Sequence, residues 1–160
     1  MTTPTTTSTA TPGTPVLDAR LIGLAHYAGR AVLENVLARH GVTFQQSVTL
    51  RLVAIAEGPV ERESLVGEIG GALKIDRAEA HTVVGQLVEG GLLTADSTRL
   101  TITDAGRELY RITSGETAPI SARIYAGIPT EDLAVAGRVL SLIIGRANAE
   151  LTALAGPAAE

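Results

Sequence analysis

The segment KIDRAEAHTVVGQLVEGGLL, from Lys74 to Leu93, carries the start, the body and the end of one helix. Asp76 is a typical N-cap residue, and Glu79 follows it at the spacing of a capping box. Apolar residues then recur at helical spacing until the glycine pair that begins at Gly90 ends the helix. The segment therefore predicts a capped amphipathic helix that runs into a turn and a strand. Its apolar stripe consists of Ala80, Val83, Val84, Leu87 and Val88.

A second segment, RLTITDAGREL from Arg99 to Leu109, predicts a short strand that leads directly into another helix capped by Thr103. The apolar residues 92–94 and 100–102 flank the polar turn 96–98, which is the pattern of a short β-hairpin. A helix beside a small hairpin is a shape suited to the major groove of DNA.

Helical periodicity extends over most of the remaining chain. The helix that begins at Thr103 is expected to reach about Thr113, where residues 114–119 interrupt or end it before a looser helical segment to Tyr125. We therefore predict a mainly α protein with a small β-hairpin, in which residues 43–109 form a winged helix-turn-helix lobe. The other predicted helices are about Val16 to His40, Phe44 to Ala56 (capped by Thr43), Arg62 to Leu73 and Thr130 to Leu154.

Composition narrows the class of protein. The chain has 160 residues, 45% of them hydrophobic, which suits one domain with an ordinary core. It has no cysteine, which excludes disulfides and zinc-thiolate sites, and no apolar run long enough for a membrane span. Residues 1–15 are almost entirely Thr, Pro, Ser and Gly, so we expect a disordered tail. A cytoplasmic protein without membrane contact is the expectation.

The first and last helices are more apolar than packing on a small domain requires. An exposed apolar surface of that size usually marks a partner interface. We therefore expect residues 16–42 and 110–156 to be dimerisation helices of a homodimer. In the last helix the apolar positions are Leu133, Ala136, Val139, Leu140, Ile143, Ile144, Ala147 and Leu151.

These features together resemble the MarR (multiple antibiotic resistance regulator) family of bacterial transcriptional regulators. The resemblance covers Val16 to Leu154 and rests on the helix order, the two quoted segments and the long apolar last helix. It implies a dimer whose first and last helices interlock and whose fourth helices enter successive major grooves of a pseudo-palindromic operator. It also implies that many relatives bind a small anionic aromatic ligand that relieves repression.

The outward face of the Lys74–Leu93 helix supplies the candidate DNA contacts. Gln86 can pair with adenine, and Arg77 can reach guanine or a phosphate. Glu79 has three alternative roles: closing the capping box, accepting from a cytosine amino group, or repelling the duplex. In typical relatives the positions of Thr82 and Gln86 are often arginine, so this face is poor in positive charge. The predicted DNA-binding residues are Lys74, Arg77, His81, Thr82, Gln86 and Arg99.

The hairpin departs from the family pattern as well. Relatives carry a longer wing whose tip enters the minor groove, whereas Ala95 to Arg99 leaves only a tight turn with one cation. The net charge of −4 also works against DNA binding, which draws much of its affinity from lysine and arginine. We expect binding that depends on the helix and on salt concentration, with Arg99 either touching a phosphate or solvated at the surface.

No catalytic, cofactor or metal-binding pattern is present: the three histidines are scattered, and no nucleophile elbow or phosphate loop occurs. The sequence therefore predicts that the protein is not an enzyme. Cations beside aromatic rings suit a carboxylate or phenolate ligand, although the same residues can be core edges and surface ion pairs. The candidate ligand residues are His26, Tyr27, Arg30, Tyr110 and Arg111.

Two functions follow from these patterns. The first is a homodimeric, ligand-responsive transcriptional regulator of MarR type, expected to act as a repressor on double-stranded DNA. The alternative is a winged-helix dimer with weak or lost DNA binding that acts as a protein-interaction or small-molecule-binding module. Salt-dependent binding to a duplex separates the two, because phosphate contacts release counterions.

Overall fold

The computed structural model describes residues 15–156, and these residues form six helices and three short strands. They divide into two compact units, residues 15–117 and residues 118–156, which are described separately below. Apart from Pro15, the predicted disordered tail lies outside the described residues.

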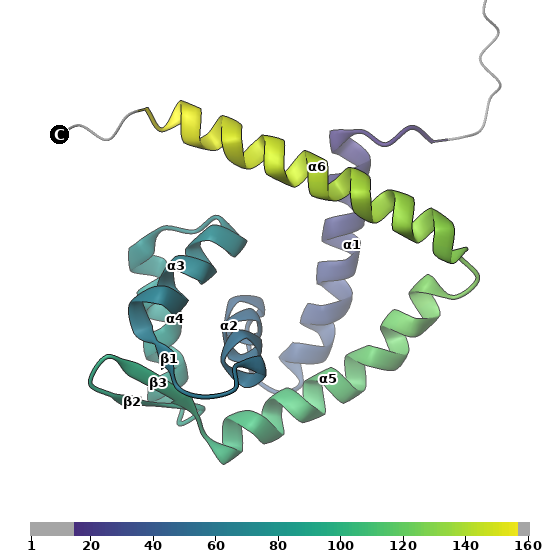
Figure 1. The fold of residues 1–160 in the computed structure, drawn as a ribbon. Coiled ribbons are helices and arrows are strands. Elements are labelled where there is room, and N and C mark those ends of the chain that lie inside the picture. Colours follow the sequence, from purple (N-terminus) through teal and green to yellow (C-terminus); the bar gives the residue numbers. More distant parts are fainter. Residues whose placement is uncertain (1–14, 157–160) are drawn as a thin grey trace, which may run out of the picture. The chain divides into compact units, whose positions relative to one another are not determined.

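Most of the elements belong to the first unit, which is drawn in purple to green in Figure 1. The predicted fold class, mainly α with a small β component, is confirmed. The elements are α1 (Ala19–Ala38), α2 (Phe44–Ile55), β1 (Val60–Glu61), α3 (Arg62–Leu73), α4 (Arg77–Glu89), β2 (Leu93–Asp96), β3 (Arg99–Ile102), α5 (Asp104–Tyr125), which runs into the second unit, and α6 (Thr130–Leu154).

Local capping fixes where the central helices begin. At α2, the Thr43 hydroxyl accepts from the Gln46 N–H, and the Gln46 side chain accepts in return from the Thr43 N–H. At α4, the Asp76 carboxylate accepts from the Glu79 N–H at 2.8 Å. Such caps typically contribute about 1 kcal/mol each because they satisfy helix N–H groups that have no helical partner. The predicted caps at Thr43 and Asp76 are confirmed.

The fifth helix differs from its prediction. Its start is as expected, since the Thr103 hydroxyl accepts from the Gly106 N–H at 3.0 Å. The expected interruption at residues 114–119 is wrong, because α5 continues through Pro119 to Tyr125. Proline removes only one helical hydrogen bond. Around it the helix is maintained, and the Thr117 hydroxyl donates to the Thr113 carbonyl at 2.9 Å.

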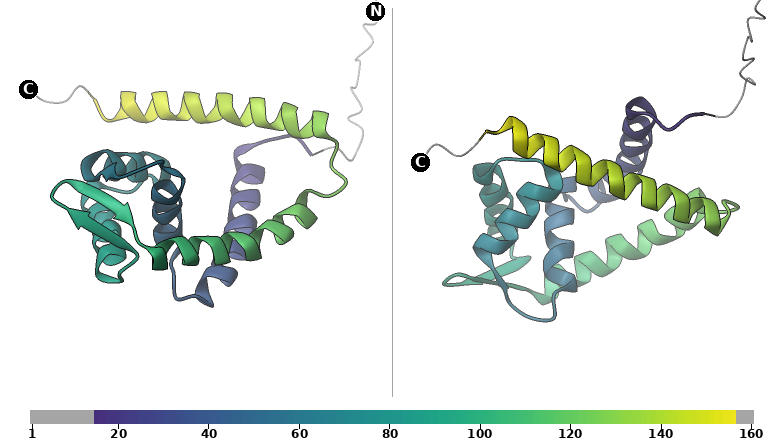
Figure 2. Two further views of the ribbon diagram at one scale, coloured as in Figure 1. Left: turned by 60° about the horizontal axis from the view of Figure 1, so that its bottom comes forward. Right: turned by 45° about the horizontal axis from the view of Figure 1, so that its top comes forward.

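The sheet has three antiparallel strands in the order β1-β3-β2. Strands β2 and β3 form the predicted hairpin, with Leu93 opposite Ile102 and Asp96 opposite Arg99. Figure 2 shows this hairpin extending from the sheet beside α4. The third strand, β1, was not predicted, because a strand of two residues has no periodicity that a sequence can display.

One hydrophobic core holds the first unit together. Helix α2 packs against α1, α3, α4 and β3, so it is the central element of the unit. Burying one leucine or isoleucine contributes about 2 kcal/mol, and six such side chains are almost fully buried in this unit. The core cluster is Leu50, Val53, Leu65, Val66, Ile69, Ala80, Val84, Leu87, Leu93, Leu100 and Ile102.

Two glycines join α4, the hairpin and α5. Gly91 has φ +70°, a left-handed conformation that strains residues with a side chain. Gly106 lies so close to the end of α4 that a Cβ there would overlap the Leu92 carbonyl oxygen and lie 2.9 Å from Ile102 Cγ1. The Thr103 hydroxyl donates to the Gly91 carbonyl at 2.8 Å, so a side-chain hydrogen bond also connects the start of α5 to the turn after α4. We call this region, with Gly91, Thr103 and Gly106, the α4–α5 joint.

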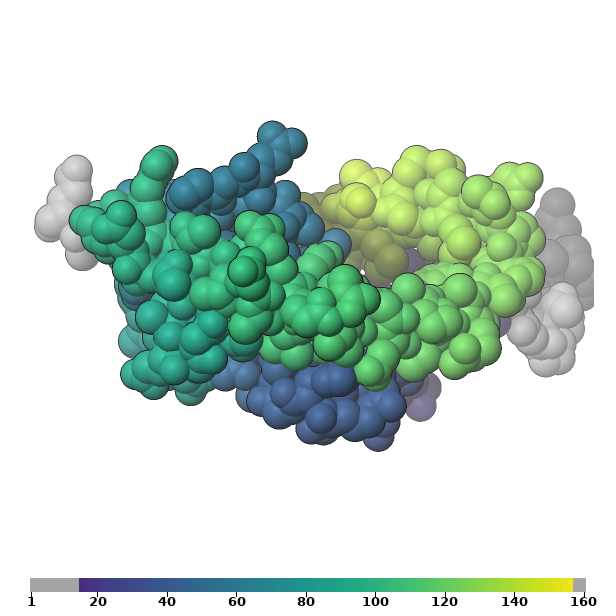
Figure 3. All heavy atoms as spheres, turned by 90° about the horizontal axis from the view of Figure 1, so that it is seen from below, coloured from purple at the N-terminus to yellow at the C-terminus, as the bar shows by residue number. Residues whose placement is uncertain are grey.

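The end of α1 is tied to α5 by an ion-pair group. Glu116 contacts Arg39 Nη2 at 2.8 Å and His40 Nε2 at 3.0 Å. Figure 3 shows the dark blue end of α1 beside the green atoms of α5. These contacts attach α1 to the first unit at its C-terminal end, where Val36 and Leu37 are buried.

Helix α6 is apolar without being buried. It begins after Pro129, has Glu131 and Asp132 in its first turn, and has no buried residue. No helix among residues 15–156 is long and apolar enough to cross a membrane. The large apolar side chains exposed on α6 are Leu133, Val135, Val139, Leu142, Ile143, Ile144, Leu151 and Leu154.

Candidate DNA-binding surface

The buried stripe of α4 determines which of its side chains face solvent. Ala80, Val83, Val84 and Leu87 are buried in the core, so the opposite face is outward, as the sequence predicted. The predicted stripe is confirmed for these four residues, and Val88 is partly buried at its edge. The outward face carries Arg77, Ala78, Glu79, Thr82, Gln86 and Glu89, all exposed, and the half-buried His81 and Gly85.

Both basic side chains of α4 face one carboxylate of α3. Glu63 forms an ion pair with Arg77 through its Oε2 atom, and its Oε1 atom lies 3.6 Å from His81 Nε2. Arg77 and His81 are four residues apart and so lie on one side of α4, within reach of the first turn of α3. The sequence reasoning missed Glu63, which is 14 residues from Arg77 in the chain.

Two glutamine side chains of α2 contact the outward face of α4. Gln45 Nε2 donates to Glu79 Oε1 at 2.7 Å, and Gln46 Nε2 donates to Gln86 Oε1 at 3.1 Å. Three roles were predicted for Glu79: closing the capping box, accepting from cytosine, and repelling the duplex. The contact with Gln45 is different from all three, because the Glu79 carboxylate accepts from a side chain of α2. The Gln86 amide group keeps its own N–H donors, which can still meet an acceptor on a base edge. These contacts fix the two side chains relative to α2.

The other predicted contacts lie at the two ends of this surface. The Thr82 hydroxyl donates to the Ala78 carbonyl at 3.0 Å, which leaves its oxygen able to accept. Lys74 is the C-cap of α3 and has φ 56°, so it forms the left-handed turn between α3 and α4. Helix α3, this turn and α4 thus form a helix-turn-helix.

The hairpin is as short as the sequence predicted, because only Ser97 and Thr98 separate β2 from β3. Arg99 lies on the central strand, and its neighbours on both sides are acidic, Asp96 on β2 and Glu61 on β1. One further cation, not predicted for this site, begins α3 beside the hairpin: the Arg62 N–H donates to the Thr98 carbonyl at 2.8 Å.

The predicted ligand residues do not come together in one place. His26 and Tyr27 contact each other edge to face with ring centroids 5.4 Å apart, and Tyr27 is 68% exposed. Tyr110 packs against the core, and Arg111 pairs with Glu108. Arg30 lines a cleft, and no group of three metal-ligating side chains occurs among residues 15–156.

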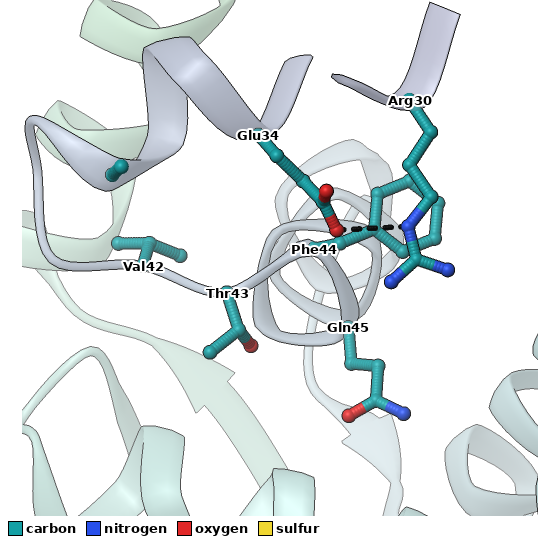
Figure 4. Close-up of a pocket in the computed structure, with 7 residues that line it drawn as sticks. Arg30, Glu34, Val42, Thr43, Phe44 and Gln45 are labelled. Atoms are coloured by element: carbon teal, nitrogen blue, oxygen red, sulfur yellow. Dashed lines mark hydrogen bonds and ion pairs between the residues drawn. The ribbon is translucent and has the colours of Figure 1, made fainter. Parts of the chain in front are cut away.

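That cleft lies between α1 and α2 and has a volume of about 390 Å³. The Arg30 guanidinium lies over the Phe44 ring at 4.6 Å from its centroid, and its Nε donates to Glu34 at 2.8 Å. Figure 4 shows Arg30 and Glu34 meeting beside the Phe44 ring, with Gln45 on the same side of the cleft. The full lining is Arg30, Glu34, Ala38, Val42, Thr43, Phe44 and Gln45.

One ion pair on the surface changes the titration of its members. The hydrogen bonds from Arg111 hold the pKa of Glu108 below its ordinary value, and the same bonds raise the pKa of Arg111. Both bonds are short, at 2.8 and 2.5 Å, and both side chains are exposed. Arg111 is therefore paired with Glu108 at the surface and does not line the α1–α2 cleft described above.

The helix-turn-helix of α3 and α4, followed by the β2–β3 hairpin, defines a winged-helix protein. No protein-family model matches the chain, and no curated protein matches it in sequence. Solved structures do match, and some of them are MarR-family proteins or hold a small-molecule ligand.

The MarR protein from Peptoclostridium difficile aligns with a TM-score of 0.70 and 17% identity over 89% of this chain and 99% of that one. The Staphylococcus aureus MarR in complex with salicylate and kanamycin has a TM-score of 0.65 and 22% identity, over 78% and 85%. CouR from Rhodococcus jostii RHA1 bound to p-coumaroyl-CoA has a TM-score of 0.66 and 18% identity, over 78% and 89%. The chain therefore has the MarR-type winged-helix fold, which confirms the resemblance.

Proposed function

We propose that this protein is a homodimeric DNA-binding transcriptional regulator of MarR type. The observation that carries the proposal is the outward face of α4, where Arg77, Thr82 and Gln86 are exposed on a helix whose opposite face is buried. A helix held in this way beside a hairpin has the geometry that enters a major groove. In this proposal the protein is a cytoplasmic repressor that binds a pseudo-palindromic operator.

Each predicted contact has a role within it. Gln86 reads adenine, Thr82 meets a thymine methyl group or a phosphate, and Arg77 with His81 reaches guanine or phosphate. Lys74 and Arg99 lie at the ends of the surface, where phosphate contacts position a protein on the duplex. Arg62 joins Arg99 at the hairpin because its backbone is bonded to the hairpin turn.

The domain assignment is part of the same proposal. Residues 43–109 form the DNA-binding lobe, and residues 16–42 and 110–156 supply the dimer interface. The exposed apolar side chains of α1 and α6 support this division, since an apolar surface of that extent favours a partner. In a two-fold dimer the two α4 helices would be related by symmetry, which sets the half-site spacing near one helical turn.

A small anionic aromatic ligand is the proposed effector, with the α1–α2 cleft as its site. Arg30 over the Phe44 ring can hold a carboxylate and an aromatic ring together, provided that the Arg30–Glu34 pair opens. Salicylate is the probe: calorimetric titration should detect binding that Arg30→Gln weakens and Arg20→Gln leaves unchanged. Equal binding by both variants would remove the cleft from the proposal.

The test of DNA binding is selection from random duplex DNA, followed by titration of the selected duplex at two salt concentrations. A shared half-site repeated about one helical turn apart, with steep salt dependence, is the expected result. If no sequence is selected and no duplex binds at low salt, the proposal that the protein is a DNA-binding regulator is wrong.

The second candidate is a winged-helix dimer that acts as a protein-interaction or small-molecule-binding module. The acidic neighbours of Arg99 on both adjacent strands favour it, because they lower the potential that would attract a phosphate. Ligand uptake or protein capture with no DNA binding in the same titrations would support this candidate.

A further inference from the structure

The position of Glu63 has a consequence for every phosphate that approaches α4. Arg77 and His81 are the only basic side chains in the α4 sequence, and both face the Glu63 carboxylate. The Arg77 and Glu63 side chains are well exposed, at 64% and 55%, and 37% of the half-buried His81 side chain is exposed. A phosphate that binds either basic group must therefore displace this carboxylate or share the group with it.

We infer that Glu63 is an intramolecular competitor of DNA that masks the basic groups of α4 and lowers the affinity of this surface for phosphate. The inference rests on the proposed function, because it names a residue that regulates the proposed site. It requires that the carboxylate can be displaced. Exposed ion pairs contribute little to stability because water screens both charges, so a phosphate with its own charge-assisted hydrogen bonds can replace one.

The competition acts on affinity and leaves sequence preference unchanged. Of the two contacts proposed for Arg77 and His81, guanine or phosphate, the masking concerns phosphate, and phosphate contacts carry no sequence information. Gln86, the proposed reader of adenine, contacts Gln46 and not Glu63. Removing the Glu63 charge should therefore strengthen binding to the selected duplex and to a scrambled duplex by the same factor.

The competition also sets the salt dependence. Each phosphate neutralised by the protein adds about 0.9 to the slope of log K against log salt concentration. In the wild type the Glu63 carboxylate cancels one positive charge at the interface. Its removal should make the slope steeper by about one phosphate contact.

The experiment compares Glu63→Gln with Glu68→Gln in the full chain, by fluorescence anisotropy with both duplexes over a range of salt concentrations. Glu68 is the matched control because it lies on the same helix, is exposed and forms no ion pair among residues 15–156. We expect Glu63→Gln to bind both duplexes roughly threefold to tenfold more tightly, and Glu68→Gln to stay near the wild type.

Four outcomes overturn the inference. Weaker binding by Glu63→Gln would make Glu63 a positioning residue for Arg77. Equal gains for Glu63→Gln and Glu68→Gln, or an undiminished gain when Arg77→Ala is added, would show that Glu63 does not act by masking Arg77. A gain limited to one duplex would show that Glu63 acts on a base contact and not on a phosphate contact.

A second measurement keeps the inference separate from the proposed function. Elution from a heparin column reports binding to a sulfated polyanion and needs no operator. If no variant binds any duplex, the proposed DNA-binding function is wrong. Later elution of Glu63→Gln than of Glu68→Gln would still support the masking of the basic groups by Glu63. Identical elution of the two variants overturns the masking whatever happens with DNA.

Discussion

Helices α4 and α6 are both amphipathic, yet they differ in what covers their apolar faces. Helix α4 has 13 residues and buries four of them in the core of its own unit. Helix α6 has 25 residues and buries none. The comparison separates a helix whose apolar face is covered within its own unit from one whose apolar face is exposed. We place the proposed DNA contacts on the first helix and the proposed dimer contacts on the second.

The largest expected effect concerns the joint that holds α4 in place. Gly106→Ala would put a methyl group into the Leu92 carbonyl, which is backbone and cannot rotate away. We expect a loss of about 3 kcal/mol or more in the free energy of unfolding, measured by urea denaturation. Gly71→Ala is the control, because a Cβ there meets nothing within 4 Å and should stabilise α3 by up to about 1 kcal/mol. Similar effects of the two variants would show that the close approach at Gly106 is absent.

The next prediction tests whether α6 needs a partner. Leu151→Lys would place an ammonium group in the apolar surface of a dimer, at a cost of about 3 kcal/mol, or roughly a hundredfold in the dissociation constant. Sedimentation equilibrium measures that constant. Thr152→Lys adds the same charge one residue later and should have far less effect. A monomeric wild type, or equal dissociation of both variants, would contradict the comparison between α4 and α6.

A smaller effect is expected on the outward face of α4. Gln86→Ala removes an exposed side chain whose only hydrogen bond to another residue among 15–156 is the one to Gln46. Loss of a base contact should weaken binding to the selected duplex about tenfold and relax the preference at one base pair. The thermal midpoint of unfolding should stay near that of the wild type. An unchanged preference at every base pair would exclude Gln86 as a reader.

The smallest effect belongs to the surface pair of Glu108 and Arg111. Because the folded pKa of Glu108 is lowered, its stabilising contribution is present above the unfolded value and is lost as the pH falls through the folded value. Thermal melts of Glu108→Gln and wild type should therefore differ slightly at about pH 7, begin to converge below the ordinary glutamate pKa of 4.5, and coincide once the pH lies below the lowered pKa of the folded state. A difference that grows as the pH falls would contradict the pairing.

Local signals explain how much of the fold could be predicted. The bounds of α3 and α6 agree with the sequence prediction, and so do the caps at Thr43, Asp76 and Thr103. Each of these features depends on residues within four positions of one another. The continuation of α5 through Pro119 could not be predicted, because proline is also a common end of a helix.

The contacts of the candidate site lie beyond the reach of the sequence. Glu63 meets α4 across 14 residues, and Gln45 and Gln46 do so across 34 and 40. No periodicity links residues so far apart, so the outward face of α4 was predicted without the groups that contact it. The neighbours of the predicted ligand residues could not be read from the sequence for the same reason. Arg30 lines a cleft with Phe44 because α1 packs on α2, and this packing joins residues that are far apart in any helical pattern.

The joint at Thr103 also offers a probe of local opening. The Gly106 N–H is held by the Thr103 hydroxyl, and that hydroxyl is held by the Gly91 carbonyl, so the amide proton is released only when the end of α4 and the start of α5 separate. Its exchange with deuterium should therefore be slow for a residue in the first turn of a helix, where amide protons ordinarily exchange quickly. Following that single proton would report how often the two helices come apart.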